Sequence, residues 1–158
     1  MPADLPQYDP FMLLAIEQAR LSAAAGDVPV GAVIVRDGAA IAAAHNRRAL
    51  DNDPTAHAEM LAIRQAAALT GDWRLTGCTM VVTLEPCCMC AGAMVLARMD
   101  RLVYGASDPK TGAVATLYQL CSDPRLNHQL EILPGLRSAE CGAILTQFFS
   151  AQRALGKK

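Results

Sequence analysis

The chain has 158 residues, of which 53% are apolar and 18% charged, and its formal net charge is −1. This composition excludes an intrinsically disordered chain, and the length suits a single domain, residues 1–158, with one hydrophobic core. The near-neutral charge excludes a protein that attracts nucleic acid over its whole surface, so binding of RNA would need a local basic patch.

Residues 1–10 contain Asp4 and Asp9 and lack the basic and then apolar stretch of a secretory signal. No later run approaches the roughly 18 apolar residues of a membrane span. We therefore expect a soluble cytoplasmic protein that makes no contact with a membrane. In that reducing compartment the six cysteines indicate metal binding or catalysis more than a disulfide framework.

The first half of the chain predicts a helix, a hairpin and a second helix. Apolar residues at helical spacing predict a helix over residues 11–25. Two apolar runs, residues 28–35 and 39–45, are separated by a segment that contains Asp37-Gly38, which predicts a β-hairpin. After a polar loop, residues 56–69 predict a helix that has Thr55 as its N-cap and ends at Gly71.

The second half alternates strands and helices. Residues 78–84 predict a buried strand, Pro86 opens a helix over residues 87–98, and residues 101–105 predict another short strand. A turn-rich loop follows at residues 108–112. A fifth strand over residues 129–133 and a last helix over residues 138–155 complete the prediction.

This order of elements predicts an α/β layered domain with a mixed sheet. Strands joined through helices should be parallel, and the hairpin pair should be antiparallel. The helices that begin near His57 and Cys87 should then lie on the same face of the sheet.

Two short motifs carry the chemistry, His57-Ala58-Glu59 and Pro86-Cys87-Cys88-Met89-Cys90, each at the predicted start of a helix. Cys87 and Cys90 are three positions apart and share a helix face. One imidazole nitrogen and two thiolates suit Zn²⁺ and leave a fourth tetrahedral position for water, which is the ligand number of a catalytic zinc. We expect His57, Cys87 and Cys90 to bind one zinc ion.

Glu59 is too close in sequence to His57 to ligate the same ion easily, but it can take a proton from the bound water and pass it to a substrate. Cys88 should point about 100° away from Cys87 on the helix, so we expect it to serve packing. A redox Cys-x-x-Cys pair is an alternative, although it has no use for Glu59. A structural zinc is another, with a fourth ligand among Cys78, Cys121, Cys141, His45 and His128.

These motifs resemble the His-x-Glu…Pro-Cys-x-x-Cys pattern of zinc-dependent nucleobase deaminases. Residues 28–33, 53–59, 84–87, 89–93 and 108–112 are similar to the bacterial tRNA adenosine deaminases, over a core of about residues 9–151. The resemblance implies a three-layer α/β/α cytidine deaminase-like fold with a central mixed sheet of about five strands and helices on both faces. It also implies a homodimer with one zinc per subunit, which hydrolytically converts adenosine to inosine at the wobble position of a tRNA anticodon stem-loop.

The resemblance assigns zinc to His57, Cys87 and Cys90 and the proton shuttle to Glu59. It places substrate contacts at four further residues: Asn46, Asp108, Lys110 and Phe149. Judged from the residues alone, Asn46 is a turn former at a strand end, residues 108–112 are a solvated turn, and Phe148 and Phe149 belong more often to a core. At most one of these two phenylalanines should reach RNA.

Two alternatives to the implied function stay open. A deaminase of a free base, nucleoside or nucleotide, of the guanine, cytidine or deoxycytidylate type, would use the same zinc site. A non-catalytic zinc-binding RNA module would bind zinc and tRNA but would have no use for Glu59. Scattered basic residues could form a local RNA-binding patch: Arg47, Arg48, Arg98, Arg101, Lys110, Arg125 and Arg153.

Overall fold

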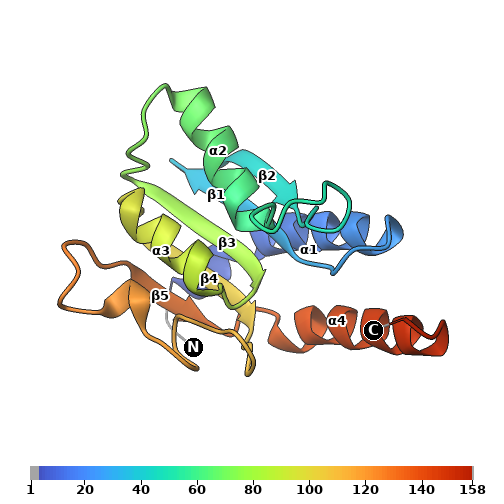
Figure 1. The fold of residues 1–158 in the computed structure, drawn as a ribbon. Coiled ribbons are helices and arrows are strands. Elements are labelled where there is room, and N and C mark those ends of the chain that lie inside the picture. The colour runs from blue at the N-terminus through green and yellow to red at the C-terminus, as the bar shows by residue number, and fades with distance from the viewer. Residues whose placement is uncertain (1–3, 158) are drawn as a thin grey trace.

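A computed structural model describes residues 4–157, and within them a five-stranded sheet is flanked by four α-helices (Figure 1). In chain order the elements are the 3₁₀ helix η1 (Leu5–Tyr8), α1 (Asp9–Ala24), β1 (Gly31–Arg36), β2 (Ala39–His45), α2 (Ala58–Thr70), β3 (Cys78–Leu84), α3 (Cys88–Leu96), β4 (Arg101–Ala106), the 3₁₀ helix η2 (Leu120–Ser122), β5 (Glu131–Pro134) and α4 (Ser138–Ala154). The elements predicted from the sequence are all present in the predicted order.

The sheet is mixed and has the strand order β2-β1-β3-β4-β5. β1 pairs antiparallel with both β2 and β3, whereas β3, β4 and β5 are parallel to one another. Asp37 and Gly38 both have positive φ, 52° and 75°, as a two-residue hairpin turn between β1 and β2 requires. The predicted hairpin and the predicted parallel pairing of β3 with β4 are therefore confirmed.

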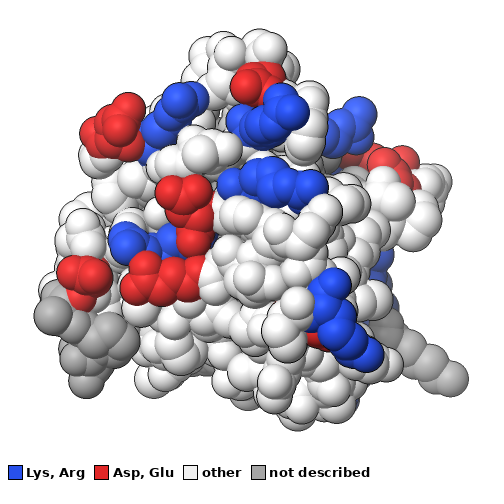
Figure 2. Space-filling view, turned by 90° about the vertical axis from the view of Figure 1, so that its left-hand side faces the viewer, with Lys and Arg blue, Asp and Glu red and all other residues white. Residues whose placement is uncertain are grey.

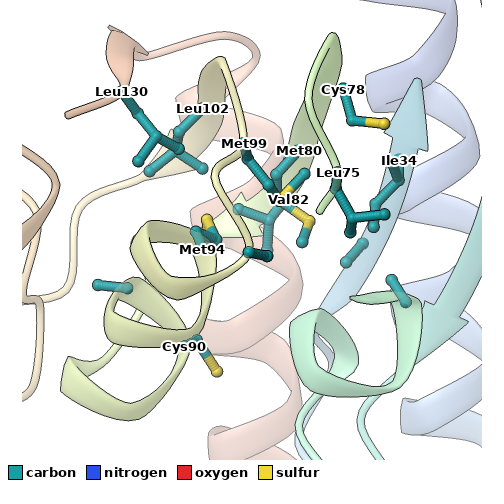
Figure 3. Packing of buried hydrophobic residues seen from close by; sticks show 14 of the residues in the cluster. Ile34, Leu75, Cys78, Met80, Val82, Cys90, Met94, Met99, Leu102 and Leu130 are labelled. Carbon is teal, nitrogen blue, oxygen red and sulfur yellow. The ribbon is translucent and has the colours of Figure 1, made fainter. Parts of the chain in front are cut away.

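The helices cover both faces of the sheet, as the three-layer prediction requires. Buried residues of α2 and α3 pack in one hydrophobic cluster against one face, and buried residues of α1 and α4 pack in a second cluster against the other. Figure 1 shows α2 and α3 side by side in front of the strands. Figure 3 shows how Met80 and Val82 of β3 and Leu102 of β4 point toward Met94 of α3 in the first cluster.

Several boundaries differ from the sequence predictions by one to three residues, for example at the start of β1, and the differences that bear on the site lie in α2 and α3. The N-cap of α2 is His57 and not Thr55, because the Thr55 hydroxyl donates instead to Asp53 Oδ1 over 2.7 Å. Cys87 is the N-cap of α3 and not its first helical residue. That helix ends before Arg98, which has a positive φ of 60°.

The arrangement brings two helix starts and two strand ends to one edge of the sheet. α2 begins after His57, α3 begins after Cys87, and the parallel strands β3 and β4 end at Leu84 and Ala106. Crevices at the carboxyl ends of parallel strands are a usual place for ligands in open α/β sheets. No helix of the described residues is long and apolar enough to cross a bilayer.

Candidate metal centre and active site

His57, Cys87 and Cys90 form a compact cluster in which one donor atom of each residue lies within 4.8 Å of the others. His57 Nδ1 lies 3.6 Å from Cys87 Sγ and 3.5 Å from Cys90 Sγ. The two N-cap residues have extended backbones, with ψ of 152° at His57 and 176° at Cys87, and Cys90 follows in the first turn of α3. Helix starts place positive dipole ends at the cluster, which favours thiolate over thiol.

The spacing of the cluster fits a zinc ion. Zn–S bonds of about 2.3 Å and Zn–N bonds of about 2.0–2.1 Å at tetrahedral angles place a nitrogen and a sulfur ligand about 3.6 Å apart. The two distances from His57 Nδ1 match this value. Within residues 4–157, no fourth His, Cys, Asp or Glu joins the cluster, so its ligand number is that of a catalytic zinc.

Proton sharing within the cluster favours a thiolate at Cys87. A hydrogen bond from Cys90 lowers the pKa of the Cys87 thiol to about 4 against the opposing effect of burial, and a further hydrogen bond from His57 adds to the decrease. The same interaction with Cys87 raises the pKa of His57. The neighbouring Cys87 sulfur and burial raise the pKa of Cys90. One thiolate therefore forms readily, and a cation at the cluster would favour the second.

Cys88 lies outside the cluster, as predicted, but the prediction that it serves packing is wrong. Its side chain is exposed, whereas Cys90 is fully buried. The angular step of about 100° along a helix turns Cys88 away from the cluster and toward solvent. The other candidate ligands lie outside the cluster. Three of them are buried in the two hydrophobic cores, namely Cys78, Cys121 and Cys141. His45 is hydrogen-bonded to the Ser22 hydroxyl, and His128 Nε2 lies 2.6 Å from the carbonyl oxygen of Met99.

Glu59 is the buried acid of this site. It is 4% exposed and lies in the first turn of α2, two residues after His57. Burial raises the pKa of its carboxyl, and the charge of Cys87 adds to the increase, although its own backbone N–H, His57 and Cys90 oppose it. A carboxyl whose pKa is moved toward neutrality is suited to take up and release protons.

A pocket of about 690 Å³ opens over the cluster. Seven of the eight residues predicted for the site line it, namely Asn46, His57, Glu59, Cys87, Asp108, Lys110 and Phe149, while Cys90 lies buried beneath. Phe149 of α4 reaches the pocket, whereas Phe148 packs edge-to-face on it at 5.5 Å between ring centroids and is not part of the lining. The structure thus brings together side chains from segments up to about a hundred residues apart in sequence.

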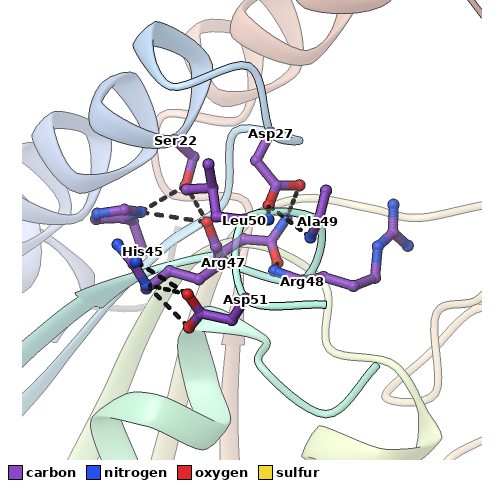
Figure 4. A network of polar contacts seen from close by, with 9 residues as sticks. Ser22, Asp27, His45, Arg47, Arg48, Ala49, Leu50 and Asp51 are labelled. Atoms are coloured by element: carbon purple, nitrogen blue, oxygen red, sulfur yellow. Dashed lines mark hydrogen bonds and ion pairs between the residues drawn. The ribbon is translucent and has the colours of Figure 1, made fainter. Parts of the chain in front are cut away.

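Asn46 is held by the protein itself, through hydrogen bonds to the polar network around Asp27 and Arg48 that Figure 4 shows. Its amide nitrogen donates to Asp27 Oδ1 over 3.1 Å and to the carbonyl of Val28 over 3.0 Å, and its oxygen accepts from the backbone N–H of Arg48. Asp27 Oδ2 also accepts from two backbone amides of the following loop, Ala49 and Leu50. The structure thus confirms that Asn46 stabilises a turn, and its amide oxygen keeps one lone pair that no described residue uses.

The seven basic residues of the predicted patch divide into two groups and one residue apart, Arg98, whose side chain donates to the carbonyl of Val95 outside the pocket. Arg47 pairs with Asp51, Arg101 with Glu131 and Arg125 with Asp123. Arg48, Lys110 and Arg153 line the pocket, and none of these three has a carboxylate within salt-bridge distance among the described residues. Figure 2 shows interleaved basic and acidic residues on the face farthest from α4. Three of the seven basic residues of the predicted patch are therefore placed to meet an anionic ligand in the pocket.

Sequence reasoning missed two buried carboxylates near the pocket, Asp27 and Glu85, each 2% exposed. Glu85 lines the pocket, and its carboxylate accepts hydrogen bonds from the loop that follows β4. A signal was present, because an acidic residue that directly follows a run of buried strand residues must find hydrogen-bond donors.

Residues 6–106 match the family described as the cytidine and deoxycytidylate deaminase zinc-binding region. The chain is 47% identical to the tRNA-specific adenosine deaminase of Bacillus subtilis over 154 residues, covering 98% of this chain and 94% of that protein. It is 47% identical to the enzyme of the same name from Agrobacterium fabrum over 90% of this chain and 94% of that protein.

Two solved structures are also similar. One comes from studies of A-to-I editing by tRNA:A34 deaminases at the wobble position of transfer RNA. It superposes on this chain with a TM-score of 0.83 and 47% sequence identity, and the match covers 85% of this chain and 98% of that one. The guanine deaminase from Bacillus subtilis has a TM-score of 0.61 and 42% identity over 63% of this chain and 64% of its own.

Proposed function

Since this chain belongs to the tRNA-specific adenosine deaminases, a zinc-dependent family that converts adenosine to inosine, we propose that the pocket over His57, Cys87 and Cys90 is where the wobble adenosine of a tRNA anticodon reacts. The observation that carries this proposal is the geometry of the cluster. Its nitrogen and sulfur atoms lie 3.5–3.6 Å apart, and a buried glutamate lies in the same pocket.

We propose that these three residues hold the zinc ion of each subunit. Zinc held there would act as a Lewis acid that polarises a water molecule for attack on the substrate. Each residue would supply one ligand atom: a thiolate sulfur from Cys87, a thiolate sulfur from Cys90 and Nδ1 from His57. Because His57 and Cys87 line the pocket, a water molecule and a substrate would both have access to a zinc ion held there.

Glu59 acts as the proton carrier in this proposal. It takes one proton from the water molecule as the oxygen attacks C6 of adenine, and it delivers that proton to N1. It then moves the second proton of the former water to the amino group, which leaves as ammonia while C6 becomes a carbonyl. Water and adenosine are consumed, inosine and ammonia are formed, and Glu59 returns to its starting state.

Residues at the rim of the pocket contact the RNA around the reacting base. Asp108 and Lys110 lie on the loop after β4, Phe149 offers an aromatic face that is 44% exposed, and Asn46 offers one lone pair. Bases of single-stranded RNA stack on such aromatic faces. An anticodon loop suits this pocket because its bases are already unpaired, which avoids a cost of a few kcal/mol for extracting a base from a duplex.

We propose that the protein is a homodimer of single-domain subunits in the cytoplasm. Exposed apolar side chains near the end of α3 and between β4 and β5 support an interface there, among them Leu96, Leu117, Tyr118 and Leu126. Light scattering coupled to size-exclusion chromatography should give about twice the 16.8 kDa chain mass. A monomer at micromolar concentration would contradict this part of the proposal.

The test of the function measures inosine in an anticodon stem-loop that contains adenosine at the wobble position. The purified protein should form inosine there and leave free adenosine, cytidine and guanine unchanged. Turnover of guanine or cytidine instead would favour a deaminase of free bases or nucleosides.

The role of Glu59 is tested by Glu59→Ala. This variant should retain zinc and lose activity by about 100-fold or more, since general acid-base groups contribute a factor of roughly 10²–10⁴ to the rate. Turnover at the wild-type rate would exclude the role of Glu59.

A further inference from the structure

Glu85 is a second buried carboxylate at the pocket, and the proposed reaction does not use it. It follows β3 directly and stands two residues before Cys87, with 2% of its surface exposed. A buried charge of this kind needs strong compensation. No Lys or Arg within residues 4–157 forms an ion pair with it, so hydrogen bonds must hold the charge.

The hydrogen bonds come from one loop, residues 108–116. Glu85 Oε1 accepts from the backbone N–H of Asp108 over 3.1 Å and from the Thr116 hydroxyl over 2.5 Å. Glu85 Oε2 accepts from three consecutive backbone N–H groups, over 3.2, 2.9 and 3.0 Å, at Val114, Ala115 and Thr116. One side chain thus joins the beginning of the loop to its end.

These contacts occupy the carboxylate fully. A carboxylate has about four lone-pair sites, and Glu85 already has five donors. It therefore has no free site with which to bind a substrate or to accept a proton during turnover. This separates Glu85 from Glu59, which lines the pocket beside the metal cluster and makes no hydrogen bond to the loop.

The loop is closely fitted around the carboxylate. A Cβ atom added to Gly112 would lie 2.5 Å from Glu85 Cδ and Oε2 and 2.5 Å from the carbonyl oxygen of Asp108. The backbone N–H of Ala113 donates to the carbonyl of Pro86 over 2.8 Å, so the segment that leads to Cys87 also touches the loop. Asp108 in turn accepts from the N–H groups of Lys110 and Thr111. The tip of the loop is therefore rigidly linked to Glu85.

We propose that Glu85 is a positioning residue that fixes the loop of residues 108–116 in the shape that presents Asp108 and Lys110 to the RNA. This inference rests on the proposed function, because the loop must meet the RNA for its shape to matter. Glu85 acts through the loop and does not touch the reacting base. Its loss should weaken engagement of the RNA more than it slows the chemical step, which depends on Glu59 and the metal cluster.

The experiment compares Glu85→Gln with Thr116→Val and with the control Glu131→Gln. The Gln side chain keeps the shape of Glu but places an N–H donor against the donors of the loop. Thr116→Val removes only the hydroxyl donor to Oε1. Glu131→Gln removes the same charge at the other end of the sheet, where Glu131 pairs with Arg101 at the start of β4.

For Glu85→Gln, KM for the anticodon stem-loop should rise by about 10-fold or more, as expected when a charge-assisted hydrogen bond worth about 1.5–3 kcal/mol is lost. Thr116→Val should show a smaller increase of KM. In both variants kcat should stay within about threefold of wild type. Zinc content should stay at one ion per chain, and amide hydrogen exchange should become faster at Asp108, Val114, Ala115 and Thr116. Glu131→Gln should match wild type in all of these measurements.

An unchanged KM in Glu85→Gln, or a loss of zinc together with kcat, would overturn the positioning role. If Glu85→Gln does not fold, the decision passes to Thr116→Val, whose KM and amide exchange must then differ from wild type. If the wild-type protein forms no inosine in the stem-loop, the proposed function fails, and this is seen before any variant is measured. The two failures are therefore distinguishable.

Discussion

Cys88 and Cys90 are two positions apart in α3, yet only one of them suits metal binding. Cys90 is fully buried with its sulfur 3.5 Å from His57 Nδ1, whereas Cys88 is exposed. The helix alone explains the difference, because Cys90 shares a face with Cys87 and Cys88 does not. The choice between these two thiols therefore depends on their angular position on the helix and not on residue type.

This difference predicts opposite results for two serine substitutions. Cys88→Ser should keep one zinc per chain and near wild-type deamination, because no contact of the cluster is changed. Cys90→Ser should lose most of the zinc, because the hydroxyl of serine is a poor ligand where a thiolate is needed. Zinc content per chain, measured by elemental analysis after gel filtration, checks both results. A loss of zinc in Cys88→Ser would contradict the ligand set.

The residues of the metal cluster could be predicted from the sequence because each motif is short and continuous. His57 with Glu59, and Cys87 with Cys90, are held in relative position by a single helix start. Glu85 could not be found in this way, because its donors lie 23 to 31 positions later in the chain. The local sequence around Glu85 shows that it needs donors but not where they come from.

At the scale of the elements, Gly31 allows α1 to pack against β1. A Cβ atom at this position would lie 1.8 Å from the carbonyl oxygen of Ala15 and 2.7 Å from the backbone nitrogen of Ala19. Both of these atoms belong to the α1 backbone, which cannot move aside as a side chain can. The contact between helix and strand therefore depends on the absence of a side chain at residue 31.

Gly31→Ala should destabilise the fold by about 3 kcal/mol or more, the upper range for added volume in a packed core. Gly92→Ala in α3 is the matched control, because nothing lies within 4 Å of the added Cβ atom. That substitution should be neutral or stabilise the helix by about 0.5–1 kcal/mol. Urea unfolding of both variants measures the two free energies. Equal stability of the two variants would show that α1 can shift to admit the methyl group.

A second link between elements joins the start of α1 to the start of α4. Arg137 donates to Asp9 through two nitrogens, over 2.7 and 2.9 Å, and to Glu140 over 2.9 Å. The hydrogen bonds from Arg137 lower the pKa of Asp9 below its ordinary 3.8, burial opposes this decrease, and the charge of Arg137 adds to it. The two partners are 128 positions apart, so the pair forms only in the folded protein.

Because the pKa of Asp9 is lowered in the folded state, its contribution to stability is present above the unfolded pKa of about 3.9. It is lost as the pH falls through the lower, folded pKa. Asp9→Asn should therefore lower the Tm at pH 7, and the difference from wild type should shrink below about pH 4. In an Arg137→Ala background the same substitution should have no effect. A Tm difference that does not depend on pH would show that packing, and not the ion pair, is responsible.

At the scale of the whole molecule, the order of elements and the mixed character of the sheet could be predicted, but the strand order could not. The sequence predicts a strand over residues 78–84, because every member is apolar or β-branched, and β3 has the same bounds. Nothing local to the sequence indicates that β3 pairs antiparallel with β1, since α2 intervenes between the hairpin and β3. The pairing of β3 with β1 depends on how the buried faces of α2 and β3 pack together in the folded protein.

The distribution of charge also emerges only in the folded molecule. The net charge of −1 gives no sign of an RNA-binding protein. Folding pairs Arg47, Arg101 and Arg125 with carboxylates, and it leaves Arg48, Lys110 and Arg153 around one pocket. These last three come from the loop after β2, the loop after β4 and α4, so no sequence window contains them together. If the pocket binds an anticodon loop as we propose, these three side chains are the cations that its phosphates would meet there.

This arrangement predicts how binding depends on salt. Each phosphate of single-stranded nucleic acid that is neutralised contributes a slope of about −0.7 to the logarithm of affinity against the logarithm of salt concentration. Arg48→Ala, Lys110→Ala and Arg153→Ala should each weaken binding of the stem-loop and make the slope shallower by about 0.7. Arg125→Ala should leave the slope unchanged, because its guanidinium pairs with Asp123 over 2.7 Å. Binding titrations over about 50–200 mM salt, with Glu59→Ala as background to prevent turnover, measure the slopes. Equal slopes for Arg153→Ala and Arg125→Ala would mean that the phosphates of the RNA do not contact the cations at the pocket.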